Sequence, residues 1–187
     1  MSMDPSKPIL EEDACQELLA LARSSLEGYF TTGQVPAYQP GNPELLKGGA
    51  AFVSLHNGEE LRGCIGLLSD ELELYRTVQR CALSAATEDT RFNPVTLDEM
   101  PKLCIEISVL SEPRRITDVE LIEVGKHGII IARGRQRGLL LPQVASKYNW
   151  DRKTFLSQTC RKAGLSPNAW RQPDTVIQIF EAQVFSE

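Results

Sequence analysis

The dipeptide Asn57-Gly58 constrains the fold of this chain most, because it lies between two largely apolar runs. Asn-Gly is the strongest short-range signal for a β-hairpin, since both residues adopt the positive φ that tight hairpin turns need. We therefore expect strands over residues 50–55 and 61–68, joined by a turn over residues 56–59. Two strands joined by so short a turn pair antiparallel.

Further elements follow from the spacing of apolar residues and from turn residues. Apolar positions at helical spacing predict helices over residues 11–30 and 151–163. A third helix is expected to begin at a capping box of Asp70 and Glu73 and to end near residues 87–89. Apolar and alternating segments predict strands over residues 103–110, 128–132, 139–141 and 176–185. Because the strands follow one another mostly as hairpins, we predict an α+β fold with a largely antiparallel sheet flanked by helices.

Composition argues against several classes of protein. A net charge of −5 weighs against a general binder of nucleic acid or anionic membrane, and no apolar run reaches the ~18–20 residues that span a bilayer. The five cysteines are scattered, odd in number and without a C-x-x-C pair, which argues against a zinc site or a disulfide framework. We therefore expect a soluble cytoplasmic protein without metal or cofactor, and a disordered stretch over residues 1–7.

The segment that is most informative about function is the hexapeptide Leu61-Arg62-Gly63-Cys64-Ile65-Gly66. Alternate side chains of a strand share a face, so Arg62, Cys64 and Gly66 are expected to point one way and Gly63 the other. A guanidinium on the face of a cysteine favours the thiolate, which is the reactive form. Two glycines weaken a strand, which suggests that another backbone or a ligand approaches closely here. These features indicate a site without naming its reaction.

Cys64 and Arg62 each have two interpretations. Cys64 is either a nucleophile or redox-active thiol, or a small residue packed in a strand, as free cysteines often are. Arg62 either clamps a carboxylate or phosphate of a ligand, or forms an ion pair with a neighbouring-strand carboxylate such as Glu106. The other cysteines are expected to pack in the protein interior: Cys15, Cys81, Cys104 and Cys160.

Glu88, Asp89 and Arg91 gather at the expected end of a helix, where the helix dipole disfavours carboxylates. The carboxylates either act as general bases and shape a ligand site, or Asp89 and Arg91 stabilise the turn by side-chain hydrogen bonds. Gln143 follows Pro142 in an apolar segment. Its amide either orients a ligand or caps backbone groups at the start of a helix.

Two further candidates are a loop histidine and an arginine-rich turn. His127 would serve as a base for Cys64 only if the fold brings the two together, which the sequence does not show. The turn either contacts phosphate or RNA, or is a solvated hairpin tip, and it lacks the aromatic residues that stack bases. Its alternating arginines are Arg133, Arg135 and Arg137.

The hexapeptide resembles the hallmark of the AMMECR family. Three further segments, at residues 85–92, 138–145 and 159–165, resemble motifs of that family in the same order. The resemblance implies one domain over residues 8–187, with a larger antiparallel-sheet part and a smaller α/β subdomain. It also implies a cleft near the cysteine motif that is suspected to be an active site. The compact chain is similar to microbial members, which often accompany a Memo-like protein and a radical-SAM protein.

Our leading hypothesis is an enzyme that acts on a small or modified substrate, with Cys64, Glu88 and Asp89 as catalytic residues. The expected substrate-binding residues are Arg62, Gly63, Gly66, Arg91 and Gln143. The alternative is a non-catalytic binding or scaffold protein that docks a partner enzyme. A third hypothesis is RNA binding through the arginine-rich turn.

Overall fold

The structure is a computed structural model that describes residues 8–187, so the disorder expected for residues 1–7 lies outside the described part. The chain forms two compact units. Unit 1 comprises the described residues up to Leu110 together with Gln183–Glu187, and unit 2 comprises Ser111–Ala182.

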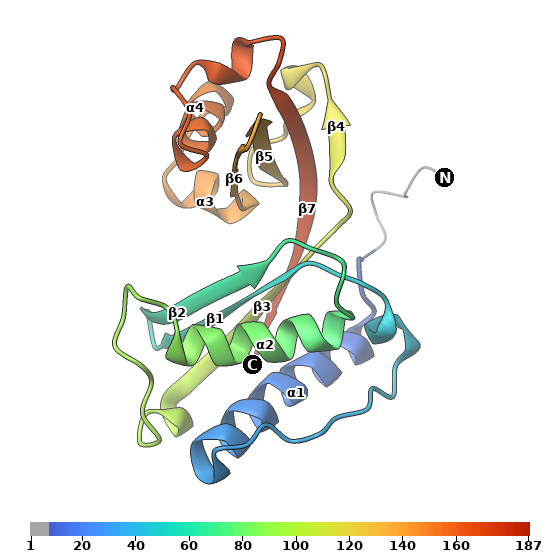
Figure 1. Cartoon of the computed structure of the whole chain (residues 1–187), viewed down its shortest axis with the longest axis vertical. Coiled ribbons are helices and arrows are strands. Elements are labelled where there is room, and N and C mark those ends of the chain that lie inside the picture. Colours follow the sequence, from blue (N-terminus) through green and yellow to red (C-terminus); the bar gives the residue numbers. More distant parts are fainter. Residues whose placement is uncertain (1–7) are drawn as a thin grey trace. The chain divides into compact units, whose positions relative to one another are not determined.

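Unit 1 is an antiparallel sheet packed against two long helices (Figure 1). Strand β1 (Ala51–Asn57) lies between β2 (Glu60–Leu67) and β3 (Leu103–Leu110) and pairs antiparallel with both. The last residues of the strand β7 (Val176–Ser186) follow next to β3. The two helices, the hairpin and the strand that we expected within residues 11–110 are confirmed. The elements are α1 (Glu12–Thr32), η1 (Pro43–Leu46), β1 (Ala51–Asn57), β2 (Glu60–Leu67), α2 (Leu74–Thr87), η2 (Met100–Lys102) and β3 (Leu103–Leu110).

In the C-terminal half of α2 the buried side is built from small residues, which lets the helix backbone approach the sheet closely. Cys81, Ala82, Ala85 and Ala86 are all buried there, and the Cys81 thiol lies 3.7 Å from the carbonyl oxygen of Ala51 in β1. Close packing of this kind leaves little room for added volume on either side. The C-terminal half of α2 is therefore held near the hexapeptide strand.

The hairpin turns one residue later than the sequence predicted. Gly58 has a φ of 60° and begins the turn, so Asn57 is the last residue of β1 instead of a turn residue. The pairing of the two strands then shifts by one residue between Leu55 and His56, which leaves Arg62 as the extra residue of a β-bulge. The simple alternation of side chains that we expected along β2 therefore holds only after the bulge.

The capping box predicted for Asp70 and Glu73 is wrong. Helix α2 begins at Leu74, and Glu73 takes the N-cap position without a side-chain hydrogen bond. The backbone N–H of Leu74 donates instead to the carbonyl oxygen of Lys47, 2.8 Å away. A tertiary backbone contact thus replaces the local cap.

Unit 2 is a smaller antiparallel sheet with short helices (Figure 1). Its strands follow the order β4-β7-β5-β6, and every adjacent pair is antiparallel. The expected strands and the helix over residues 151–163 are confirmed, whereas β4 has no counterpart because a three-residue segment shows no alternation. The elements are β4 (Arg114–Ile116), η3 (Val119–Leu121), β5 (His127–Arg133), β6 (Gln136–Leu140), α3 (Pro142–Lys147), α4 (Arg152–Lys162), η4 (Ala169–Arg171) and β7 (Val176–Ser186).

These elements confirm the predicted fold class, an α+β fold whose sheet is largely antiparallel, with a smaller second part. Each unit has its own cluster of buried apolar side chains. Within residues 8–187, no helix has both the length and the apolar character needed to cross a membrane.

Candidate functional site around Cys64

One face of the unit 1 sheet carries a row of polar side chains that includes Cys64. Val53 and Leu55 of β1 are fully buried against the helices, so Ser54, between them, points to the other face, which we call the polar sheet face. The strand register places Cys64 of β2 and Glu106 of β3 on either side of Ser54. Adjacent cross-strand Cβ atoms lie ~5 Å apart, so Cys64 and Glu106 are roughly 10 Å apart across the row.

Both glycines of the hexapeptide are closely approached by other protein atoms. A Cβ at Gly63 would lie closer than 3.0 Å to the backbone carbonyl of Ala85 in α2. A Cβ at Gly66 would collide in the same way with the ring of Phe52, its cross-strand partner. The glycines thus admit a helix backbone on one face of β2 and an aromatic ring on the other.

The backbone of Cys64 is held by two side chains from the loop after α2. Asp89 Oδ2 accepts a hydrogen bond from the Cys64 N–H at 2.9 Å, and an Arg91 Nη2–H donates to the Cys64 carbonyl oxygen at 3.2 Å. Arg91 also donates to both oxygens of Asp89, through Nε at 2.9 Å and Nη2 at 2.6 Å. β2 is an edge strand of the described sheet, so this Asp89–Arg91 clamp satisfies backbone groups that β1 does not pair.

Burial and charge make the clamp a strong interaction. The Asp89 side chain is only 4% exposed, and its hydrogen bonds with Arg91 hold the pKa of the carboxyl well below its usual range. The pKa of Arg91 is raised, above all by its hydrogen bond with Asp89. The Arg91 side chain is 57% exposed, so its guanidinium bonds the Cys64 carbonyl oxygen and still reaches solvent.

Arg62 is engaged by a different part of the same loop. Its Nε donates to Glu99 Oε1 at 2.8 Å, and Glu99 also accepts from the Thr96 N–H at 2.9 Å. These bonds lower the pKa of Glu99 to about 2, and the Arg62 hydrogen bond contributes most. Arg62 thus pairs with a loop carboxylate, Glu99, and not with Glu106 on the neighbouring sheet strand.

Comparison with known proteins identifies the family. The profile of the AMMECR1 family matches residues 19–185. The chain belongs to the AMMECR1 family. It is 42% identical to Protein MK0488 of Methanopyrus kandleri over 91% of this chain and 86% of that protein, and 40% identical to Protein PF1979 of Pyrococcus furiosus over 91% and 86%. The crystal structure of uncharacterized protein PH0010 from Pyrococcus horikoshii matches with a TM-score of 0.89 and 36% identity, covering 95% of this chain and 93% of that one.

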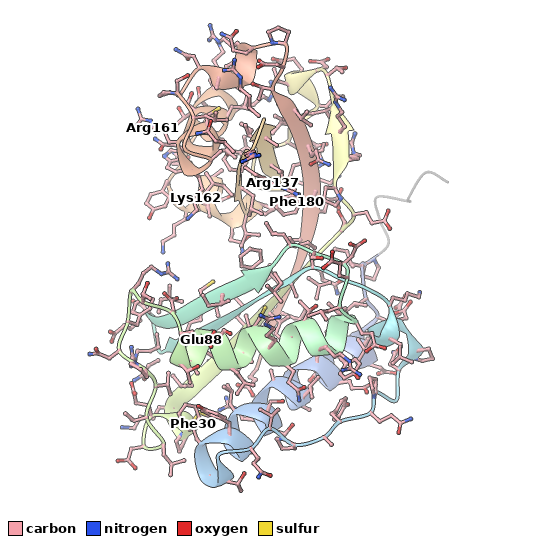
Figure 2. The ribbon with its side chains drawn as sticks, viewed as in Figure 1. Phe30, Glu88, Arg137, Arg161, Lys162 and Phe180 are labelled. Carbon is pink, nitrogen blue, oxygen red and sulfur yellow. The ribbon has the colours of Figure 1, made fainter. Side chains whose placement is uncertain are left out.

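The other predicted site residues of this AMMECR1-family chain lie outside the clamp. Glu88 is exposed at the C-terminal end of α2, where it accepts a 2.6 Å hydrogen bond from the Ser84 hydroxyl (Figure 2). Gln143 is exposed as the second residue of α3, in unit 2. His127 is buried in unit 2, where its Nδ1 accepts from the Glu123 N–H at 3.0 Å and burial lowers its pKa. The roles proposed for Glu88 and Gln143 stay predictions.

The cysteines divide between the core and the polar sheet face. Cys15, Cys81 and Cys160 are buried in the apolar clusters, as expected, but the core position predicted for Cys104 is wrong. Cys104 is half-buried because β3 alternates, which puts it on the same face as Glu106. Among residues 8–187, no three His, Cys, Asp or Glu side chains gather closely enough to hold a metal ion.

Sequence reasoning missed Ser54, His56 and Glu106 as members of this face. The sequence indicates Glu106 only as an ion-pair partner for Arg62, and His56 only as a residue beside the turn. His56 lies one step along the sheet from Ser54, and its Nε2 is buried without a hydrogen-bond partner in the described chain. The alternation of side chains along each strand predicts that these residues share a face. Only the pairing register of the strands shows that they line up with Cys64.

The lowered carboxyl pKa values of Asp89 and Glu99 predict how stability changes with acid. A carboxylate whose pKa is lowered by folding stabilises the protein above its unfolded pKa and loses that contribution as the pH falls. For Glu99 this interval runs from 4.5 down to about 2. Urea unfolding should therefore show that the free energy of unfolding falls less between about pH 5 and about pH 3 in Glu99→Gln than in the wild type. Glu59→Gln, at the exposed hairpin turn, is the control, and an equal loss in Glu99→Gln and the wild type would contradict the prediction.

Proposed function

We propose that unit 1 carries an enzyme site in which the Cys64 thiolate is the nucleophile toward an electrophilic carbon of a small or modified substrate. The observation that supports this most is the Asp89–Arg91 clamp, which fixes both backbone groups of Cys64 and brings a guanidinium to the carbonyl oxygen of the same residue. An adjacent arginine favours the thiolate, and a rigid backbone holds the sulfur in one geometry. Asp89 then acts by positioning, since its two oxygens are occupied.

The remaining roles follow from exposure and register. Arg91 keeps an exposed guanidinium edge that suits an anionic group of the substrate. Glu106, on the far side of Ser54, is placed to accept or return a proton on a substrate lying across the row. Arg62 stabilises the site indirectly, because its hydrogen bond to Glu99 attaches the loop to β2. Glu88 stays a second candidate for proton transfer.

A second candidate function is a non-catalytic scaffold that docks a partner enzyme. The observation in its favour is that Arg62 is satisfied by Glu99 and that protein atoms fill the space around both glycines of the hexapeptide. In that case the hexapeptide serves packing, and Cys64 is an inert strand residue. The resemblance to microbial members suggests a cytoplasmic partner, a Memo-like or radical-SAM protein, under either function.

Thiol reactivity distinguishes the two functions without knowledge of the substrate. We expect iodoacetamide to alkylate Cys64 of the native chain roughly tenfold faster or more than Cys104, the other half-buried cysteine, at neutral pH. Mass spectrometry of each cysteine peptide over time measures both rates in one sample. In Arg91→Ala, the alkylation of Cys64 should slow toward the rate of Cys104.

The control for the lost arginine is Arg80→Ala, which removes an exposed arginine of α2 in the same unit. If Cys64 reacts more slowly than Cys104, or only once urea has unfolded the chain, the thiol is structural and the scaffold function is favoured. An equal effect of the two arginine variants would mean that Arg91 has no specific action on the thiol.

A further inference from the structure

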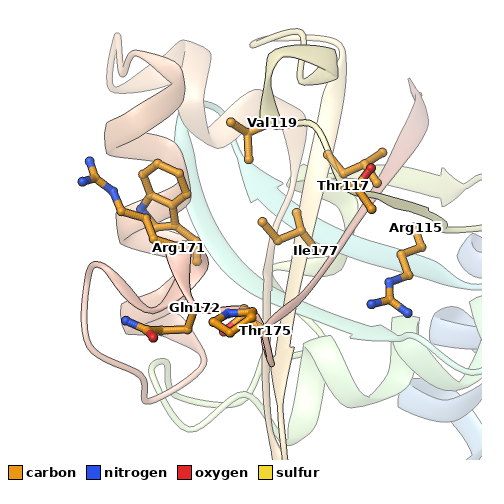
Figure 3. A pocket seen from close by; sticks show the side chains of 10 residues that line it. Arg115, Thr117, Val119, Arg171, Gln172, Thr175 and Ile177 are labelled. Atoms are coloured by element: carbon orange, nitrogen blue, oxygen red, sulfur yellow. The ribbon is translucent and has the colours of Figure 1, made fainter.

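Unit 2 contains a cavity of about 460 Å³ that is separate from the residues described above (Figure 3). Its walls come from two segments, one between residues 115 and 119 and one between residues 170 and 177. Cavities that bind small molecules usually measure ~300–1,000 Å³. The space is therefore sufficient for a small metabolite.

The cavity has a surplus of positive charge, although the whole chain has a net charge of −5. Arg115 and Arg171 line it, and no Asp or Glu is among its lining residues. In the view of Figure 3 these arginines lie on opposite sides of Ile177. Neither of them forms an ion pair with any residue from 8 to 187. Thr117 and Gln172 add neutral hydrogen-bonding groups to the same walls.

A neighbouring cavity of about 420 Å³ shows that this surplus is not general in unit 2. It is lined by two basic residues, Arg152 and Lys153, and by two acidic residues, Glu120 and Asp151. Arg152 pairs with Glu120, and Asp151 accepts a hydrogen bond from the Thr154 N–H at the start of α4. The charges of this smaller cavity are thus balanced, and both of its acidic side chains already have partners.

The rest of the larger cavity is apolar, and Trp170 forms part of its wall. Ile116, Ile177 and Val119 line it with Trp170, whose ring carries the Arg171 guanidinium 4.7 Å from its centroid. Trp170 Nε1 is buried and finds no acceptor within the described residues.

We propose that this cavity binds a small molecule that carries a carboxylate or a phosphate on a flat apolar body. Arg115 holds the anionic group, since a guanidinium group matches the geometry of both oxyanions. Arg171, on the opposite side and over the ring of Trp170, adds positive charge to the site. The isoleucines and the ring of Trp170 contact the apolar body. The site is independent of Cys64 and of the function proposed for unit 1.

The test uses the full-length chain labelled with ¹⁵N, whose two tryptophans give two indole N–H signals. Trp150→Phe assigns the signal of Trp170. Titration with phenyl phosphate and with phenylacetate should shift the Trp170 signal saturably, with a Kd of about 1 mM or lower for at least one of them. The tighter of the two identifies phosphate or carboxylate as the preferred group. Benzyl alcohol, which has the ring without the charge, should bind at least tenfold more weakly.

Exposed arginines provide matched variants for the same titration. Arg115→Ala should raise the Kd about tenfold or more and Arg171→Ala by less, whereas Arg135→Ala, which removes an exposed arginine outside the cavity, should leave it unchanged. The proposal is overturned if neither anion shifts the Trp170 signal saturably up to roughly 10 mM. It is also overturned if benzyl alcohol binds as tightly as the anions, or if Arg135→Ala weakens binding as much as the cavity variants.

Discussion

Gly63→Ala is expected to destabilise unit 1 by about 3 kcal/mol, although alanine suits a strand as well as glycine does. The new Cβ would lie closer than 3.0 Å to the Ala85 carbonyl, and that oxygen belongs to a helix backbone that cannot rotate away. Helix α2 would have to move off the sheet and give up close packing at Ala82 and Ala85. Overpacking of a rigid contact costs this much because neither side can relax alone.

Thermal and urea unfolding measure this loss, which corresponds to roughly 6–12 °C in Tm for a chain of this size. Gly41→Ala is the matched control in unit 1, since a Cβ there would meet only the Glu17 carboxylate, at an ordinary 3.7 Å. Gly66→Ala should cost less than Gly63→Ala, because the Phe52 side chain that it meets can turn aside. A Gly63→Ala protein as stable as Gly41→Ala would show that α2 is not held against β2 as described.

The sequence predicted the elements of the fold well because most of them carry a local signal. The alternation of residues 103–110 matches β3 at both ends, and the apolar spacing of residues 151–163 matches α4 to within one residue at each end. The hairpin was predicted but its turn was misplaced, since Gly58 alone supplies the positive φ. The start of α2 could not be predicted, because it depends on a backbone hydrogen bond from Leu74 to the distant residue Lys47.

The candidate site shows the same division between local and distant information. The hexapeptide and the cluster of Asp89 and Arg91 stand out in the sequence because their residue types are unusual for a strand and for a helix end. Asp89 accepts a hydrogen bond from the Cys64 backbone because the loop after α2 crosses the edge strand β2 at this point. No local sequence pattern predicts where that crossing lies. The position of Glu106 likewise depends on the register of β1 against β3. A cross-strand row of this kind becomes visible only in the folded sheet.

Asp89→Asn is expected to destabilise the protein by about 3 kcal/mol at neutral pH and to release the backbone of Cys64. The amide cannot offer two charged oxygens to Arg91 while accepting from the Cys64 N–H, and the side chain is too buried for water to replace those bonds. Hydrogen exchange followed by NMR measures the local effect directly. The Cys64 amide should exchange much faster in Asp89→Asn than in the wild type.

The neighbouring residue Ile65 is the internal control, because Cys64 and Ile65 alternate along β2 and only the Cys64 N–H points away from β1. The exchange rate of the Ile65 amide should change only as much as the global stability of the protein does. Asp98→Asn, an exposed carboxylate in the same loop, should change neither stability nor exchange. If the Cys64 amide keeps its protection in Asp89→Asn, the clamp does not hold β2, and the positioning role proposed for Asp89 fails. If stability falls but Cys64 alkylation in the folded protein keeps its rate, the clamp serves the fold alone, and activation of the thiol depends on Arg91 without Asp89.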